Sequence, residues 1–272
     1  RETNNFYTGD DYHLRFGIWL INKQFVQSHN KNSNSRFECA MNKFAALTPS
    51  EFRAYTGLRS SLQGRDFHFM SNTHKFHQKS APVFPDFYDL REHNPPVLNQ
   101  ICDLGDCHGG DWAFAITCAS ETNHALSRLL VLYKLSEQSL IDCIDGLEGC
   151  AGGDVYTGFA YIVNTVQFSG TIMQESDYPW TGTKGTCHFD LSKGIQAFSG
   201  VLWSREQPEE QLLTYIYQYG AAAASMDGSL ASFQLYSKGI YQDSACKQEM
   251  NHAVNIVGYG TENDVPYYIA RN

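Results

Sequence analysis

Eight cysteines are the residues of this 272-residue chain whose type and spacing first suggest chemistry. No two of them are separated by only two residues, which is the spacing typical of zinc sites and thioredoxin-like redox motifs. Disulfides are therefore the favoured interpretation, and a redox- or metal-responsive module is a weaker alternative. The cysteines are Cys39, Cys102, Cys107, Cys118, Cys143, Cys150, Cys187 and Cys246.

A series of short motifs runs through the second part of the chain. They cover residues 135–143, 149–153, 178–179, 185–187, 251–254, 258–260 and 267–272. In their order and spacing they resemble the papain family of cysteine peptidases, of the cathepsin L-like type. The resemblance implies an α+β, papain-like fold of two lobes, one helical and one rich in β-strands, and a chemistry that uses no cofactor.

The N-terminal region resembles the inhibitory prosegment of the same family. Residues 42–48 match one prosegment motif, except that Ala46 stands where an Asp is usual. We therefore expect a prosegment-like region over 1–84, helical over 8–58 with an extended linker over 59–84, and a peptidase domain over 85–272 whose last strands are missing. The residues that follow the helical prosegment motif are Asp11, Arg15, Ile18, Trp19, Asn22, Val26 and Asn30.

The resemblance also implies the catalytic positions. Gln100 corresponds to the glutamine that helps to bind the oxyanion, His252 to the base, and Asn272 to the amide that orients the imidazole. The nucleophilic cysteine should immediately precede Trp112, and the residue there is Asp111.

Asp111 predicts the loss of peptide hydrolysis. A carboxylate at a helix N-terminus is favoured by the helix dipole and can accept a capping hydrogen bond, so the field that activates a thiolate would stabilise an inert anion. We expect Asp111 to cap the helix and to form a carboxylate–imidazole–amide cluster with His252 and Asn272. About five residues inserted around 102–106 could displace the start of this helix.

These residues predict a catalytically inactive homologue that acts as a binding or structural component and retains its prosegment. The alternative is an active cysteine endopeptidase with a displaced thiol, such as Cys107. A metal site formed by Asp111, His252 and His108 is a weaker hypothesis.

A peptide groove and two disulfides also follow from the resemblance. Gly152 and Gly153 would offer an extended backbone edge to a bound peptide. Asp154 and Ser225 fall where apolar groups often line the main specificity pocket, and Ala253 belongs to the same predicted groove. The implied disulfides are Cys107–Cys150 and Cys143–Cys187, and the pairing of Cys39, Cys102, Cys118 and Cys246 stays open.

The elements that must position these groups are helices early in the chain and strands late in it. This order independently indicates an α+β protein. The 3.6-residue periodicity predicts a helix near the N-terminus, and Thr48 predicts the cap of a short helix. A long apolar helix is expected over 111–132, a shorter one after Ser136, and strands over 221–226, 253–258 and 267–270. The stripe expected to be buried on the first helix consists of Leu14, Ile18, Ile21, Phe25 and Val26.

The charge balance excludes some partners. With 29 acidic and 20 basic residues, the formal net charge is −9, which gives no basic footprint for nucleic acid or an anionic membrane surface. The sequence has no apolar run of membrane-spanning length. The expected partners are the chain's own prosegment in the cleft and a protein or peptide. The resemblance suggests a lysosomal or secreted protein, with an intracellular structural assembly as an alternative.

Overall fold

The computed structural model contains both α-helices and β-strands. It describes residues 7–57, 84–128, 130–197, 209–247 and 249–272. The α-helices are α1 (Gly9–Asn30), α2 (Pro49–Phe52), α3 (Asp111–Ser127), α4 (Glu137–Cys143), α5 (Val155–Asn164), α6 (Glu209–Tyr219) and α7 (Ala231–Gln234). The strands are β1 (Phe37–Cys39), β2 (Tyr88–Asp89), β3 (Thr171–Met173), β4 (Gly194–Gln196), β5 (Ala222–Met226), β6 (Tyr236–Gly239), β7 (His252–Glu262) and β8 (Val265–Arg271). The predicted α+β class is confirmed.

The chain packs as two units whose boundaries differ from the sequence division near residue 84. The first unit combines residues 1–56 with residues 226–251, and the second combines residues 57–225 with residues 252–272. The N-terminal region is therefore completed by a segment from far along the chain. The linker predicted over 59–84 lies, apart from its last residue, outside the described residues.

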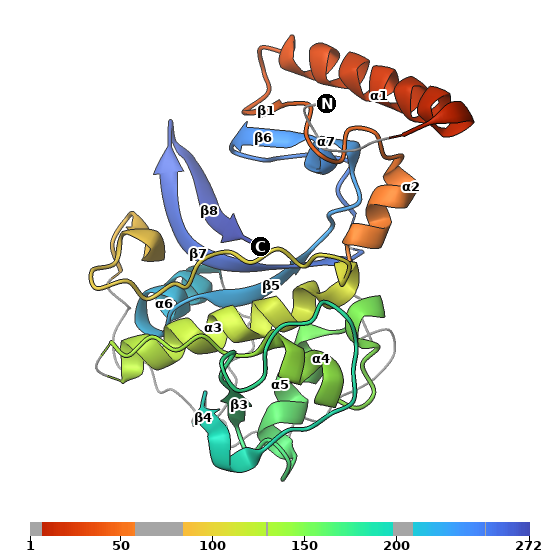
Figure 1. Ribbon diagram of the computed structural model, residues 1–272. Helices are drawn as coiled ribbons and strands as arrows, with labels where there is room; N and C mark the ends of the chain where they lie inside the picture. The colour runs from red at the N-terminus through yellow and green to blue at the C-terminus, as the bar shows by residue number, and fades with distance from the viewer. Residues whose placement is uncertain (1–6, 58–83, 129, 198–208, 248) are drawn as a thin grey trace. The chain divides into compact units, whose positions relative to one another are not determined.

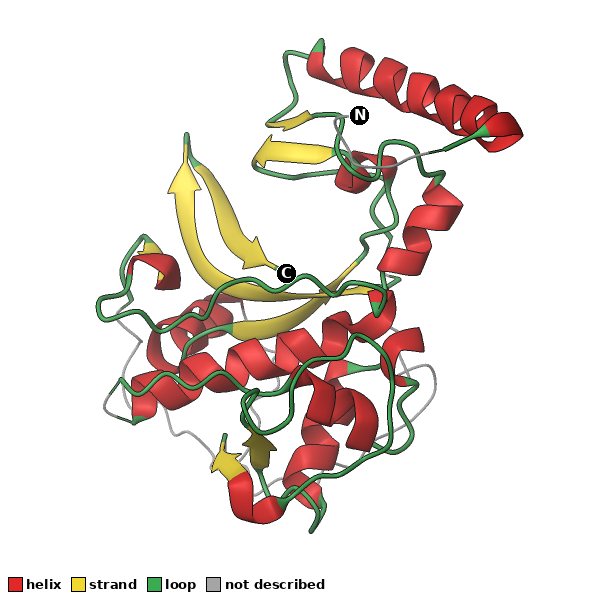
Figure 2. Cartoon of the chain, in the orientation of Figure 1, coloured by secondary structure: helices red, strands yellow, loops and turns green. Residues whose placement is uncertain are grey.

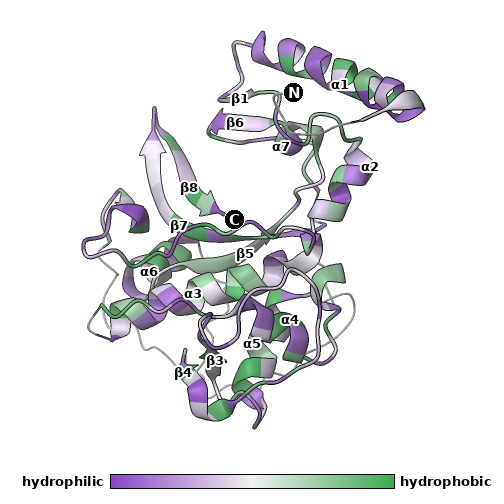
Figure 3. Ribbon diagram, in the orientation of Figure 1, coloured by the Kyte–Doolittle hydropathy of each residue, from purple (hydrophilic) through white to green (hydrophobic). Residues whose placement is uncertain are grey.

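Helix α1 of the first unit buries a different face from the one predicted. Val26 is buried as expected, but Leu14 and Ile21 are 59% and 67% exposed. The buried face instead includes Asn22, whose side-chain amide donates to the carbonyl oxygens of Ala45 and Leu47 at 2.8 and 3.1 Å. Figure 3 shows apolar and polar residues alternating along α1. The prediction of one buried apolar stripe is therefore wrong. The buried face of the helix includes a polar side chain, whose amide satisfies neighbouring carbonyl groups.

The rest of the first unit joins segments that are distant in sequence. Strand β1, which the sequence did not predict, pairs with β6 in antiparallel orientation. The predicted cap at Thr48 is confirmed, since its hydroxyl accepts from the Glu51 amide and the Glu51 carboxylate accepts from the Thr48 amide. This reciprocal pair is a capping box, which fixes the start of α2.

The second unit is built on a sheet in which β7 pairs with β2, β5 and β8. The three predicted strands are confirmed as β5, β7 and β8, and the last two extend beyond their predicted bounds. Figure 2 shows β7 and β8 as a long antiparallel hairpin. Its turn contains Asn263 and Asp264, both at positive φ, a conformation that these residue types tolerate better than most.

Helix α3 lies between this sheet and the helices α4 and α5 (Figure 1). Trp112 and Ile116 on α3 are completely buried with Ile141 of α4 and Ile162 of α5. The helix ends at Ser127 rather than at the predicted residue 132, and Leu130 has a left-handed φ of 60° that no helix continues through. The shorter helix α4 begins as predicted, with the Ser136 hydroxyl accepting from the Ser139 amide at 3.0 Å.

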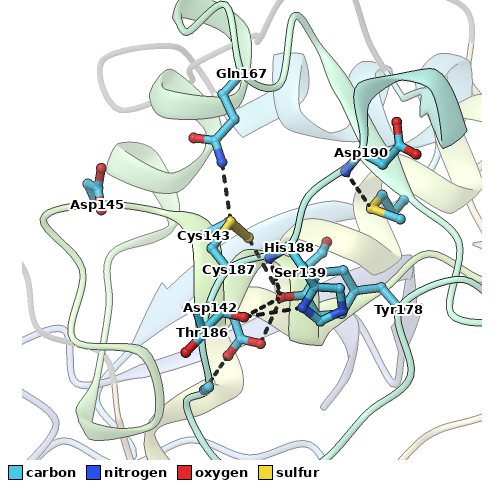
Figure 4. Close-up of a disulfide and its surroundings, with 12 residues drawn as sticks. Ser139, Asp142, Cys143, Asp145, Gln167, Tyr178, Thr186, Cys187, His188 and Asp190 are labelled. Atoms are coloured by element: carbon cyan, nitrogen blue, oxygen red, sulfur yellow. Dashed lines mark hydrogen bonds between the residues drawn. A yellow bond between two sulfur atoms is a disulfide. The ribbon is translucent and has the colours of Figure 1, made fainter.

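Both predicted disulfides, Cys107–Cys150 and Cys143–Cys187, are confirmed within the second unit. Figure 4 shows the second bond beside the Tyr178 side chain, whose hydroxyl donates to Asp142 at 2.9 Å. Burial and the bond to Asp142 raise the pKa of Tyr178 to about 12, so it remains a hydrogen-bond donor. The remaining cysteines, Cys39, Cys102, Cys118 and Cys246, are outside any disulfide in the described part of the chain.

Candidate active site

Asp111 is the first residue of α3 and is completely buried. It is not the helix cap that the sequence predicted, because Gly110 occupies the N-cap position and makes no side-chain capping bond. The Asp111 Oδ1 atom accepts from the Trp112 amide at 2.9 Å. Its carboxylate lies in the first turn, where the positive end of the helix dipole favours an anion.

His252 contacts this carboxylate from the first residue of β7. Its Nδ1 atom lies 2.9 Å from Asp111 Oδ2, and the side chains of the two residues are 9% and 1% exposed. The same Oδ2 atom accepts from the Ala253 amide at 2.8 Å. The predicted contact between Asp111 and His252 is therefore confirmed, and the inserted loop has not displaced the start of α3 beyond hydrogen-bond reach.

Asn272 and Gln100, the other two predicted catalytic residues, also belong to the second unit. The Asn272 side-chain amide donates to the carbonyl oxygen of Ala253 at 2.7 Å, next to His252 in the chain. Gln100 and Asn272 both line one small pocket, whose lining does not include Asp111 or His252.

A buried charged cluster, which the sequence did not predict, lines part of this pocket. It consists of Glu121, Lys134 and Glu137, and the Lys134 ammonium contacts both carboxylates. Glu137 also accepts from the Thr117 hydroxyl at 2.7 Å, and Glu121 from the Leu135 amide at 2.8 Å. The apolar pattern of α3 does not predict this cluster, because a single glutamate on a buried helix does not indicate which residue will pair with it.

Burial sets the protonation of this cluster. It raises the pKa of Glu121 to about 7, against the opposing attraction of Lys134. Burial would lower the pKa of Lys134, but Glu137 and Glu121 outweigh it and the pKa of Lys134 is raised. The lysine thus stays charged while Glu121 can exchange a proton near neutral pH.

The predicted groove residues have structural partners. Gly152 and Gly153 are buried and follow the disulfide-bonded Cys150. Asp154 is 4% exposed, and its carboxylate caps α5 by accepting from the Thr157 amide at 2.7 Å. Ser225 of β5 is half-buried, and Ala253 is fully buried. These partners give Asp154 a structural role in the start of α5.

The displaced-thiol alternative is wrong for Cys107, whose sulfur is buried and bonded to Cys150. The metal hypothesis also lacks support, because the described residues contain no cluster of three or more His, Cys, Asp or Glu side chains able to hold an ion. Among the same residues, no helix is both long and apolar enough to cross a bilayer.

Comparison with known proteins gives two family matches. Residues 84–272 match the model described as papain family cysteine protease, and residues 1–52 match the cathepsin propeptide inhibitor domain. Cathepsin K of Mus musculus is 34% identical over 265 residues, which cover 94% of this chain and 75% of that protein. Cysteine proteinase 3 of Entamoeba histolytica is 34% identical over 266 residues, covering 96% of this chain and 77% of that protein.

Solved structures of proenzymes are similar over almost the whole chain. Procathepsin L 3 from the larval midgut of Tenebrio molitor has a TM-score of 0.79 and 29% identity, covering 99% of this chain and 84% of its own. The proform of the ragweed pollen allergen Amb a 11, a cysteine protease, has a TM-score of 0.81 and 28% identity, covering 99% and 79%.

Proposed function

The chain belongs to the papain family of cysteine proteases and has the procathepsin fold with its propeptide, and we propose that it is a catalytically inactive member that binds peptide or protein. One observation carries the proposal. The group at the N-terminus of α3, 2.9 Å from the His252 ring, is the carboxylate of Asp111.

A carboxylate in this position cannot replace a thiolate in peptide hydrolysis. The family chemistry needs a strong nucleophile whose acyl intermediate is a thioester. Attack by Asp111 would instead form a mixed anhydride from a poor nucleophile. Each Asp111 oxygen is also committed, since Oδ1 accepts from Trp112 and Oδ2 from Ala253. The pair of Asp111 and His252 thus serves to hold α3 against β7.

Labelling with a thiol-directed epoxide or vinyl sulfone tests this proposal. We expect no labelled residue in the cleft and no turnover of dibasic or hydrophobic-basic fluorogenic peptides, after acid treatment and with reductant present. The variant Asp111→Cys should gain labelling, because His252 already lies within hydrogen-bond distance of that position. Asp111→Ser is the matched control without a thiol. Turnover by the native chain that a cysteine substitution abolishes would refute the proposal.

We also propose that the propeptide region stays attached as a permanent part of the fold. Within the first unit, the Asn42 amide donates to the Gln234 carbonyl at 2.7 Å, and the Gln234 amide donates to the Phe44 carbonyl at 2.8 Å. Ala46, where relatives of this type usually have Asp, is 9% exposed and cannot titrate. Limited proteolysis between pH 4 and 7 should leave this region bound. Its release near pH 5 from an otherwise folded chain would contradict the proposal.

A further inference from the structure

The small pocket of the second unit has two free thiols in its wall. Cys102 and Cys118 both line it, and neither belongs to a disulfide. Cys118 lies on α3 and is 9% exposed, whereas Cys102 is exposed on the inserted loop, residues 101–106. The Lys134 ammonium acts electrostatically on both thiols, which places them around one charged group. The two cysteines therefore meet at the same small hollow from two different segments of the chain.

The inserted loop that carries Cys102 is anchored at its two ends. Before it, the Asn99 amide donates to the Tyr133 carbonyl at 2.7 Å. After it, Cys107 is buried and forms a disulfide. Between these anchors, five of the six residues 101–106 are exposed. An exposed loop rearranges at a small cost in free energy because few buried contacts must break, so its thiol can approach the thiol on α3.

The two thiols differ in how readily they start an exchange reaction with a disulfide. The thiolate is the attacking species in such exchange. Burial raises the pKa of Cys118 to about 12. Burial also raises the pKa of Cys102, but the Lys134 ammonium opposes this effect, and the Cys102 thiol is exposed to solvent. Cys102 is therefore the thiol that meets an external reagent first, and Cys118 is the thiol that reacts second.

We propose that Cys102 and Cys118 form a redox-active pair, which a low-molecular-weight disulfide such as glutathione disulfide converts into a third disulfide across the pocket. The chain already contains two disulfides, and such bonds form where disulfide oxidants are present. The pair is separate from the contact between Asp111 and His252, because neither of those residues lines the pocket. The inference does not depend on whether the chain hydrolyses peptides.

The reaction consists of two exchange steps. The Cys102 thiolate attacks one sulfur atom of glutathione disulfide, forms a mixed disulfide and releases one glutathione thiolate, which takes up the Cys102 proton. The Cys118 thiolate then attacks the Cys102 sulfur, forms the protein disulfide and releases the second glutathione, which takes up the Cys118 proton. Two cysteines are oxidised, and one glutathione disulfide is reduced to two thiols. The new bond ties the inserted loop to α3 across the pocket.

Peptide mapping without reductant tests the pair. The full chain carrying Cys246→Ser, which removes the other exposed free thiol, is incubated with glutathione disulfide, blocked with a thiol reagent and digested. We expect one new cross-linked peptide that joins Cys102 to Cys118, while the buried Cys39 remains a free thiol. A chain in which Cys118 stays free, or in which Cys102 exchanges with one of the two existing disulfides, would overturn the inference.

Two single variants separate the two steps. Cys118→Ser should stop at the mixed disulfide and accumulate a glutathione adduct on Cys102, whereas the parent chain resolves this adduct. Cys102→Ser, a change at an exposed position, should leave Cys118 as a free thiol, and it keeps the test decisive if Cys118→Ser does not fold. An adduct on Cys102 that is equally stable in the parent chain would refute the second step. Oxidation of Cys118 in the Cys102→Ser chain would refute the role of Cys102.

Hydrogen exchange measures what the new bond does to the structure. The amides of residues 101–106 should exchange about tenfold or more slowly in the oxidised chain, because the bond ties an exposed loop to a buried helix. The exposed turn at residues 263–264 is the control, and its exchange rates should not change. Equal rates for residues 101–106 in the reduced and oxidised chains would contradict the proposed tie between the loop and α3.

Discussion

At the scale of single residues, Asp111 makes a buried structural contact between the start of α3 and the start of β7. Its carboxylate receives the Trp112 amide, the Ala253 amide and the His252 ring, and all three contacts are buried. Buried charges are tolerated when they are paired and hydrogen-bonded, and removing one partner leaves the other uncompensated.

We therefore expect Asp111→Ala to lower the free energy of unfolding by about 3 kcal/mol, because it leaves the Ala253 amide and the His252 ring without their shared acceptor. Asp111→Asn should cost less, since its amide oxygen can still accept from Ala253. Urea unfolding measures both variants. Asp86→Ala, at an exposed aspartate, is the control and should stay within about 0.5 kcal/mol of the native chain. An equally small effect at Asp111 would show that the pair does not stabilise the fold.

Some residue contacts were predictable and others were not. The meeting of Asp111 with His252 was expected, because the motifs around both residues keep their family order. The meeting of Cys102 with Cys118 at one pocket was not, because the spacing of two cysteines does not reveal whether the fold brings them together. The Glu121–Lys134 pair was missed for a similar reason.

At the scale of elements, α1 illustrates where periodicity fails. A count of apolar residues selects Leu14 and Ile21, which are exposed, and ignores Asn22, which is 6% exposed. The amide of Asn22 bonds to two carbonyl groups of the segment that follows β1. The position of α1 in its unit thus depends on a polar contact that no hydrophobic pattern contains.

Two neighbouring substitutions on α1 should differ accordingly. Asn22→Ala should destabilise the chain by about 1–3 kcal/mol, because it strands the carbonyl groups of Ala45 and Leu47. Ile21→Ala should change stability by no more than about 0.5 kcal/mol, because its side chain is largely exposed. Chemical unfolding with a probe in the first unit compares them directly. A larger loss for Ile21 than for Asn22 would mean that the apolar stripe is buried after all.

At the scale of the whole molecule, two disulfides constrain the second unit. Cys107–Cys150 and Cys143–Cys187 close loops of 43 and 44 residues. In the chain-entropy account, a loop of this size stabilises the native state by about 4 kcal/mol. The double variant Cys107→Ser/Cys150→Ser should lose stability of that order in thermal or urea unfolding. Cys246→Ser removes an exposed free thiol and should have little effect. A double variant as stable as Cys246→Ser would contradict this account.

The pH dependence of stability should carry the signature of Glu121. Its folded pKa, about 7, lies above the ordinary value of 4.5, because the buried carboxyl group prefers to be neutral. A raised acid pKa means that the folded state holds its proton more tightly than the unfolded state does. The contribution to stability is therefore fully present below about pH 4.5 and is lost as the pH rises towards 7. The loss is on the order of 3 kcal/mol, taking about 1.36 kcal/mol per pKa unit.

Glu121→Gln tests this assignment, because glutamine mimics the neutral acid at every pH. The free energy of unfolding, measured with urea between pH 4.5 and 7.5, should fall less steeply with pH for this variant than for the native chain. The Lys134 ammonium attracts the charged Glu121 carboxylate and so offsets part of the effect of its burial. The difference between the two profiles therefore measures the part of the burial effect that remains. Glu262→Gln, at an exposed glutamate at the end of β7, should leave the profile unchanged. If the native and Glu121→Gln profiles are parallel, another group controls stability in this range.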